Sequence, residues 1–251
     1  MLSNNQIKEI TSLQHKKYRQ KYDKFVVEGH KSSVEFLRSG KFSIYQIFAL
    51  DSWVEMNQNE FQSYSNLIHP VSEKEMGKLS MLKTATDIMM VCKKPSFPVN
   101  LQLNGYSQII YLDRIQDPGN FGTIIRIADW FGIKLILTSR GTVDIYNPKV
   151  IQASMGSICN MDFMNINLEE IDLGSLPHTI IGADIKGSSL KGFEWPGEFI
   201  LVLGNEGAGI GEENTRYIDQ WISIEGSNDR IADSLNVANA MAILGYSIFS
   251  K

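Results

Sequence analysis

The stretch over residues 199–211, FILVLGNEGAGIG, constrains the fold of this chain more than any other. It begins with five consecutive large apolar residues, a length and composition typical of a strand buried on both faces. Gly204 then opens a turn in which Gly207 and Gly209 can adopt positive φ and leave room for a ligand beside the backbone. Glu206 places a carboxylate in this turn. Open α/β sheets bind ligands beyond the carboxyl ends of such strands, although a tight turn without a ligand is the alternative.

The charge of the chain is unevenly distributed along its 251 residues. The net charge of −4 argues against a general nucleic-acid binder. Residues 1–95, however, contain 14 Lys and Arg against 10 Asp and Glu, which gives +4 and leaves −8 for the remainder. This asymmetry is compatible with a basic substrate-binding module joined to an acidic catalytic one, and equally with chance.

Cysteine, histidine and hydropathy patterns exclude several classes of protein. Cys92 and Cys159 have no metal-ligand spacing with each other or with the four histidines, so we expect neither a disulfide framework nor a zinc site. The first 20 residues lack the apolar segment of a signal peptide, and no apolar run approaches the roughly 20 residues of a membrane-spanning helix. We therefore expect a cytoplasmic protein that needs no metal and contacts no membrane.

Residues 1–94 predict a small α/β module. Helices are expected over residues 5–19, 31–38 and 53–64, and strands over residues 25–29 and 44–50. Ser72 and Glu75 have the spacing of a capping box, which predicts a further helix start. The lysine-rich stretch over residues 16–21 could bind RNA phosphate, but a solvated helix face explains its charge equally well.

Residues 95–104, which contain Pro95 and Pro98, are predicted to form a linker to a second domain over residues 105–251. This domain alternates strands and helices. Strands are expected at 109–112, 134–137, 179–183, 199–203 and 221–224, and helices at 121–131, 147–154 and 234–249. Such alternation predicts a mainly parallel sheet with helices on both faces.

Two helix starts in the second domain carry polar side chains. Asp117, Pro118, Gly119 and Asn120 form a turn sequence, and Asn120 can cap the helix that follows. Arg126 is expected near a buried helix start, where its charge needs a ligand or an ion pair with Asp117 or Asp129.

The last helix is expected to be capped by Asp233 or Ser234. Asn236 and Asn239 are poor helix formers whose amides need partners. The small residues Ala238, Ala240, Ala242 and Gly245 permit close packing against another helix. No phosphate-binding glycine motif and no nucleophile elbow occurs, which weakens the interpretation as a general nucleotide-binding protein.

Three motifs, in this order, resemble the signatures of the SpoU (TrmH) RNA ribose 2′-O-methyltransferases of the SPOUT class. The first runs from Asp117 through Asn120 and Gly122 to Arg126, the second is LGNEGAG over residues 203–209, and the third runs from Ser234 to Ala240. Residues 152–157 resemble another segment of the family. Residues 13–19 and 25–29 resemble the N-terminal substrate-binding domain of its ribosomal-RNA members.

The resemblance implies an L30e-like RNA-binding domain and a trefoil-knotted α/β methyltransferase domain that works as a homodimer with S-adenosylmethionine. It implies that Arg126 activates the ribose hydroxyl in a site shaped by Asn120, Glu206, Ser234 and Asn236. The residues that it implies for the cofactor, several of them through their backbone, are Ala183, Leu203, Gly204, Asn205, Gly207, Ile222, Ile224 and Leu235.

One segment departs from the family pattern. The third motif usually reaches its serine four residues after a glycine, whereas Ser234 follows Gly226 by eight, so residues 227–233 contain about four extra residues. This loop borders the cofactor in the family. We expect methylation of ribosomal RNA; a tRNA substrate and a catalytically silent RNA-binding homologue are the alternatives.

Overall fold

The protein folds into two compact units. The computed structural model describes residues 2–59, 61–95 and 102–250. Unit 1 consists of Met1–Ser96 and Asp144–Cys159, and unit 2 of Phe97–Val143 and Asn160–Lys251. The first crossing between the units falls in the predicted linker, of which residues 96–101 lie outside the described residues. The chain then returns to unit 1 for one segment of the second half of the sequence.

Unit 1 is built around a four-stranded sheet with the order β1-β4-β2-β3. Its strands are β1 (Lys24–Glu28), β2 (Ile44–Ala49), β3 (Ile68–Pro70) and β4 (Ile88–Lys93), and its helices are α1 (Asn4–Ser12), α2 (Lys16–Tyr22), α3 (His30–Ser39), α4 (Asp51–Asn57), α5 (Glu73–Leu79) and α7 (Pro148–Ser154). β4 is antiparallel to both β1 and β2. The predicted capping box at the start of α5 is confirmed, because Ser72 and Glu75 bond each other's backbone N–H.

The first predicted helix is wrong, because it is divided into α1 and α2. Leu13 is buried in the core of unit 1, and the hydroxyls of Thr11 and Ser12 bond carbonyls within α1. The break frees the carbonyls of Leu13 and Gln14, and Nη1 of the buried Arg19 donates to both at 2.8 and 2.9 Å. Arg19 therefore stabilises the turn from inside α2 and is not part of the exposed basic cluster.

The segment Asp144–Cys159 completes unit 1. Asp144 Oδ2 accepts from Nε of Arg19 at 2.8 Å and lies 2.7 Å from its Nη2. The Tyr146 ring packs on Phe25 with centroids 4.6 Å apart. As predicted, α7 begins at Pro148, and Asn147 caps it. Arg19 is only 2% exposed, so the Asp144 carboxylate compensates a charge that has left water.

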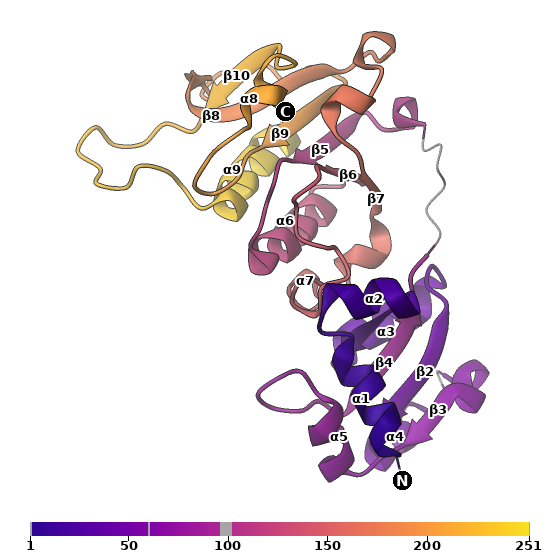
Figure 1. Ribbon diagram of the computed structural model, residues 1–251. Coiled ribbons are helices and arrows are strands. Elements are labelled where there is room, and N and C mark those ends of the chain that lie inside the picture. The colour runs from indigo at the N-terminus through magenta and orange to yellow at the C-terminus, as the bar shows by residue number, and fades with distance from the viewer. Residues whose placement is uncertain (1, 60, 96–101, 251) are drawn as a thin grey trace. The chain divides into compact units, whose positions relative to one another are not determined.

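Unit 2 contains a six-stranded parallel sheet with the order β10-β8-β9-β5-β6-β7 (Figure 1). Its strands are β5 (Gln108–Leu112), β6 (Leu135–Thr138), β7 (Asp162–Asn165), β8 (Thr179–Ser189), β9 (Phe199–Leu203) and β10 (Gln220–Ser223), and its helices are α6 (Pro118–Trp130), α8 (Glu212–Thr215) and α9 (Val237–Phe249). All five residues of β9 are buried, so the prediction of a buried strand with these bounds is confirmed.

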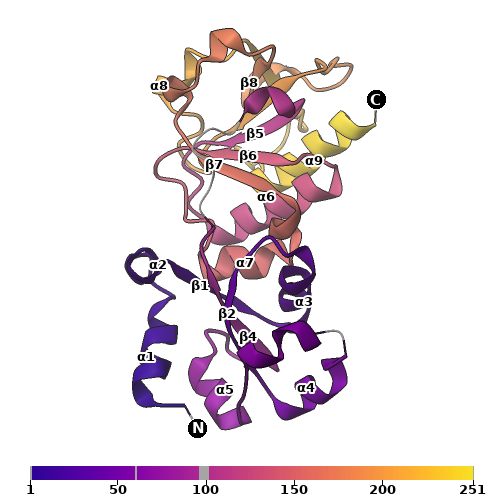
Figure 2. The same cartoon turned by 90° about the vertical axis from the view of Figure 1, so that its right-hand side faces the viewer.

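Helices α6 and α9 pack side by side in unit 2 (Figure 1 and Figure 2). Gly245 permits this approach, because a Cβ at this position would lie 2.5 Å from the ring of Phe131. The expectation of helices on both faces is only partly met. Since α7 belongs to unit 1, one face of the sheet is covered mainly by irregular segments that contribute Tyr106, Ile166 and Leu173.

Several other predicted bounds differ from the structure. The helix expected at 53–64 ends at Asn57, whose Nδ2 bonds the carbonyl of Trp53, and a 3₁₀ helix follows over Gln62–Leu67. β4 and β7 were not predicted. β4 is a continuous apolar run that resembles a buried helix turn as much as a strand, and β7 is a four-residue edge strand.

Loss of the Asp144 carboxylate should destabilise the protein. Asp144→Ala leaves the Arg19 guanidinium buried without a counter-charge, and we expect the free energy of unfolding to fall by about 3 kcal/mol. Chemical denaturation checks this. Asp172→Ala, which removes another carboxylate outside this ion pair, is the control. Equal stability of the two variants would contradict a stabilising role for the buried pair.

Candidate active site

Three motifs that are far apart in the sequence are joined by side-chain hydrogen bonds in unit 2. Nδ2 of Asn120 donates to Oε1 of Glu206 at 2.8 Å. Nδ2 of Asn236 donates to Oδ1 of Asn120 at 2.9 Å. This chain of bonds, here called the Glu206–Asn120–Asn236 network, connects the glycine-rich turn after β9 with the first turns of α6 and α9.

The caps of these two helices differ from the predicted ones. Asp117 caps α6 by accepting from the Asn120 N–H at 2.7 Å, so Asn120 lies in the first turn with its side chain free for the network. Asn236, not Asp233 or Ser234, caps α9: its Oδ1 accepts from the N–H groups of Ala238 and Asn239. The Glu206 carboxylate is thus bonded to a residue in the first turn of α6 and linked through it to the cap of α9, where helix dipoles favour negative charge.

The turn after β9 closes on itself. Asn205 and Gly209 exchange two backbone hydrogen bonds of 3.0 and 2.9 Å, and Gly209 has a φ of +68°. The Asn205 side chain accepts from the N–H of Gly207 and of Ala208, and it donates to the Arg114 carbonyl. A Cβ on Gly204 would lie 2.3 Å from the Gly209 carbonyl carbon, so only glycine fits there.

A pocket of about 440 Å³ lies beside this turn. It has the size of a small-molecule site. All eight residues predicted to hold the cofactor line it, and so do two of those predicted to shape the catalytic site. The ten are Ala183, Leu203, Gly204, Asn205, Gly207, Ile222, Ile224, Leu235, Glu206 and Ser234.

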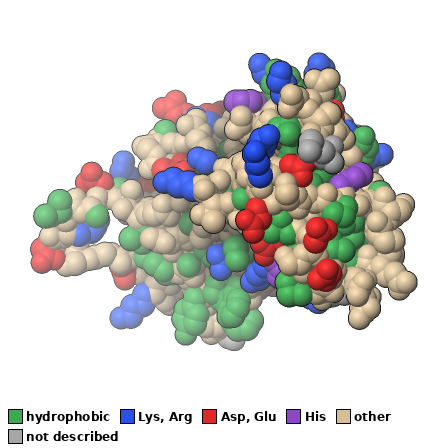
Figure 3. Space-filling model, turned by 90° about the horizontal axis from the view of Figure 1, so that it is seen from below, with side chains coloured by type: hydrophobic (Ala, Val, Ile, Leu, Met, Phe, Trp, Pro, Cys, Tyr) green, Lys and Arg blue, Asp and Glu red, His purple; other side chains and the backbone are tan. Residues whose placement is uncertain are grey.

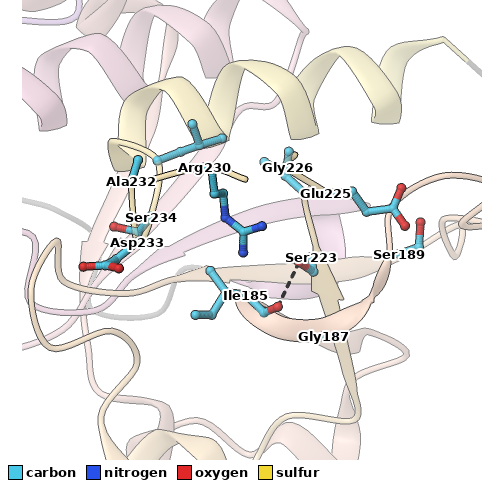
Figure 4. A pocket seen from close by; sticks show the side chains of 12 residues that line it. Ile185, Gly187, Ser189, Ser223, Glu225, Gly226, Arg230, Ala232, Asp233 and Ser234 are labelled. Carbon is cyan, nitrogen blue, oxygen red and sulfur yellow. Dashed lines mark hydrogen bonds between the residues drawn. The ribbon is translucent and has the colours of Figure 1, made fainter. Parts of the chain in front are cut away.

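The lengthened loop over residues 227–233 borders a second pocket of about 330 Å³ (Figure 4). Ile185, Ile224, Asp233, Ser234 and Leu235 line both pockets, so the two adjoin. The loop between β10 and α9 projects from unit 2 (Figure 1), and the projecting lobe carries hydrophobic, basic and acidic side chains (Figure 3).

Arg230 of this loop turns back towards the second pocket (Figure 4). Its Nη1 donates to the carbonyl of Ser227 at 3.0 Å. The extra residues therefore leave the first pocket formed and build a wall beside it.

Arg126 lies outside the network. The expectation of a buried position is wrong: Arg126 is exposed on α6, and no hydrogen bond or ion pair joins it to another described side chain. The alternative pairing does not occur either. Asp117 caps α6, and Asp129 accepts from Asn160 and lies 3.8 Å from the ammonium of Lys134. The guanidinium is thus available to a ligand or to a second molecule.

Asp113 is a structural anchor that sequence reasoning missed. It is fully buried after β5, and its Oδ2 accepts from the Gly211 N–H at 2.7 Å, which ties the end of the glycine-rich stretch to the sheet. Arg114 has a φ of +56°, and its Nε lies 3.3 Å from Oδ1 of Asp113. Burial, and then the Asp113 charge, raises the pKa of Tyr111 to about 12. The feature of the sequence that could have identified Asp113 is its position directly after a buried strand.

Neither a metal centre nor a membrane span emerges from the part of the chain that the structure describes. In these ranges no group of three or more His, Cys, Asp or Glu side chains could hold a metal ion. No helix within the same ranges combines the length and hydropathy needed to cross a bilayer.

The network should contribute to stability in a coupled way. Asn236→Ala removes both the cap of α9 and the bond to Asn120, and we expect it to lower the free energy of unfolding by about 1–2 kcal/mol. Asn236→Ser keeps a capping oxygen and should recover part of this loss. In a double-mutant cycle, Asn120→Ala and Asn236→Ala should be less than additive. Strict additivity, measured by denaturation with Asn239→Ala as control, would contradict the network.

Comparison with known proteins places the chain in a family. The sequence model of the SpoU rRNA Methylase family matches residues 107–246, and that of the MRM3-like substrate binding domain matches residues 4–90. A 23S rRNA (guanosine(2553)-2′-O)-methyltransferase of Bacillus subtilis is 29% identical over 98% of this chain and 96% of its own length.

Two solved structures share the fold over nearly the whole chain. A TrmH-family protein from Porphyromonas gingivalis is 32% identical, with a TM-score of 0.83 and coverage of 98% of both chains. An rRNA methyltransferase from Sinorhizobium meliloti, solved with AdoMet bound, is 25% identical, with a TM-score of 0.85 over 98% of this chain and 95% of that one. Together with the three joined motifs, these matches show that the chain belongs to the SpoU rRNA methylase family.

Proposed function

We propose that this protein transfers a methyl group from S-adenosylmethionine to a ribose 2′-hydroxyl of ribosomal RNA. The observation that carries the proposal is that the second and third family motifs line one pocket, and that Asn120 of the first motif is hydrogen-bonded to Glu206 and Asn236 of the other two. The B. subtilis relative, which matches over nearly its whole length, is named for ribose methylation of 23S rRNA. This favours ribosomal RNA over tRNA.

The pocket beside the glycine-rich turn fits S-adenosylmethionine. Its lining combines apolar side chains, among them Leu203, Ile222 and Leu235, with backbone that glycines at 204, 207 and 209 leave accessible. The apolar side chains suit the adenine ring and the accessible backbone suits its polar edge. When bound, the cofactor supplies a methyl group on a sulfonium, so the transfer needs no metal ion.

The chain itself must position the ribose hydroxyl and stabilise the charge that develops on its oxygen. We assign the second task to Arg126, because its guanidinium is exposed and makes no bond to another described side chain. Arginine stays protonated at neutral pH, so it stabilises the developing alkoxide electrostatically instead of removing the proton as a free base. Glu206 and Asn120, held by the network, and Ser234 at the pocket wall are placed to orient the ribose.

Removal of the Arg126 guanidinium should abolish methyl transfer and leave the cofactor affinity nearly unchanged. The assay follows labelled methyl into unmodified ribosomal RNA, and alkali-resistant dinucleotides identify ribose methylation. We expect Arg126→Ala to lower kcat by at least about 100-fold, the effect of losing one charge-stabilising donor. Arg126→Lys should retain part of the activity.

Arg216→Ala, which removes another exposed arginine of unit 2, is the control for this assay. Full turnover by Arg126→Ala would show that the role has been given to the wrong residue. Cofactor binding by the wild type without transfer to ribosomal RNA or to tRNA would favour the silent RNA-binding homologue.

The same proposal includes a homodimer and a trefoil-knotted methyltransferase domain, as the resemblance implies, and the cytoplasmic location expected from the sequence. The homodimer is supported by an apolar surface on α6 and α9, where Trp130 is 83% exposed, Phe249 68% and Tyr246 66%. Exposed apolar side chains grouped on two neighbouring helices are typical of an interface. Arg126 precedes Trp130 by one helical turn on α6 and therefore faces the same way, so this interface would bring Arg126 to a second protomer.

A charge on this surface should dissociate the dimer. We expect Trp130→Glu to give a monomer in sedimentation equilibrium. The variant should also lose methyl transfer, because Arg126 would no longer reach the second protomer. Met56→Glu, an equally drastic change at an exposed apolar position of α4 in unit 1, should remain dimeric and active. A dimeric Trp130→Glu protein would place the interface elsewhere.

A further inference from the structure

Unit 1 carries a group of exposed and half-buried lysines and tyrosines on α2 and on the neighbouring strands. The sequence drew attention only to residues 16–21, whose charge a solvated helix face explained equally well. The structure extends this cluster to four elements, α2, β1, β2 and β4. The lysine–tyrosine surface, as it is called here, consists of Lys16, Lys17, Lys21, Lys24, Lys93 and Lys94 together with Tyr18, Tyr22 and Tyr45.

On α2 the two residue types form adjacent stripes. Lys17 and Lys21 are four residues apart, as are Tyr18 and Tyr22, so each pair lies on one side of the helix. The two tyrosine rings are stacked, with centroids 6.1 Å apart and planes at 12°. The ammonium of Lys17 lies 4.8 Å from the Tyr18 ring, and that of Lys21 lies 5.2 Å from the Tyr22 ring.

The strand ends continue this surface. Lys24 at the start of β1 pairs with Lys93 at the end of β4, and its ammonium lies 3.6 Å from the Tyr45 ring centroid. The Lys94 N–H donates to the carbonyl of Asp23, the residue that ends α2. The ammonium groups of Lys17, Lys21 and Lys24 are therefore held near tyrosine rings by cation–π contacts, which order side chains that would otherwise be mobile.

The lysine–tyrosine surface has a strong excess of positive charge. Glu9 lies 3.2 Å from Lys24, and Asp23 lies 3.9 Å from Lys94. Lys16, Lys17, Lys21 and Lys93 form no ion pair with any carboxylate of the described residues. Six lysines against two carboxylates give a local charge of +4 in a chain whose net charge is −4. Such a local excess in an acidic protein indicates a polyanionic ligand.

We propose that the lysine–tyrosine surface binds the phosphate backbone of the RNA substrate. This inference rests on the proposed function, because it takes RNA as the substrate. Lysine ammonium groups at fixed spacing match a row of phosphates, and tyrosine rings can stack by their faces on unpaired bases beside them. The surface also lies almost wholly within the residues that match a substrate-binding domain.

Arg19 connects this surface to the rest of unit 1. It is the one cation of α2 that points inward, and its bonds to Asp144, Leu13 and Gln14 fix the rotation of the helix. Lys17 and Lys21 are thereby directed into solvent, whereas the half-buried Tyr22 ring packs against the core. The same residues on a helix free to rotate would not present their charges on one side.

The test compares two triple variants that lose the same charge. Lys16, Lys17 and Lys21 are changed to Gln in one, and Lys74, Lys78 and Lys83, which are exposed elsewhere in unit 1, in the other. The probe is unmodified 23S ribosomal RNA made by transcription. We expect the first variant to bind about tenfold or more weakly, with the slope of log K against log salt reduced by about 2, because each lost phosphate contact lowers it by about 0.7–0.9.

The control variant should bind this RNA like the wild type, and Lys→Arg changes at positions 16, 17 and 21 should preserve the affinity. Equal loss in the two Gln variants, or no loss in the first, would overturn the proposal. S-adenosylmethionine affinity, measured by calorimetry, should be unchanged in all variants. Failure of the proposed function can be distinguished from failure of this inference. A wild type that binds RNA through this surface but transfers no methyl group would refute only the activity.

Discussion

The Glu206–Asn120–Asn236 network fixes the relative positions of the three motif segments, two of which line the pocket. Asn236 determines which groups of the network donate and which accept. Because its Oδ1 accepts from two backbone N–H groups of α9, its Nδ2 must point outward, and it donates to Oδ1 of Asn120. Asn120 can then only donate to Glu206. A residue that caps one helix thus determines the orientation of a carboxylate in a turn 30 positions away in sequence.

Much of the fold followed from patterns that act over a few residues. β9, the extent of α7 and the capping box at Ser72 were predicted because apolar runs and helix starts depend on local chemistry. The pocket followed from the resemblance, since the eight residues predicted for the cofactor line one cavity. Spacing alone could not have joined them, because they come from four segments of the chain.

The errors occur where distant residues override local preference. α1 and α2 read as one helix, but the Arg19 guanidinium replaces the hydrogen bonds that the break removes, and its counter-charge comes from residue 144. Arg126 was expected to need a ligand or an ion pair, yet its side chain is exposed. The two aspartates that could have paired with it have other partners, because Asp117 caps α6 and Asp129 accepts from Asn160. Asp113 anchors Gly211 across nearly 100 residues. No short window of sequence contains both Arg19 and Asp144, or both Asp113 and Gly211.

The return of Asp144–Cys159 to unit 1 affects the order in which the protein can fold during synthesis. Residues 1–96 leave the ribosome first, yet without the later segment Arg19 lacks its counter-charge and Phe25 lacks the ring that covers it. The N-terminal unit therefore cannot reach its final packing until residue 159 has emerged, when β5, α6 and β6 are already synthesised. A cut between residues 96 and 102 would not release an intact substrate-binding unit, although the sequence there looks like a simple linker.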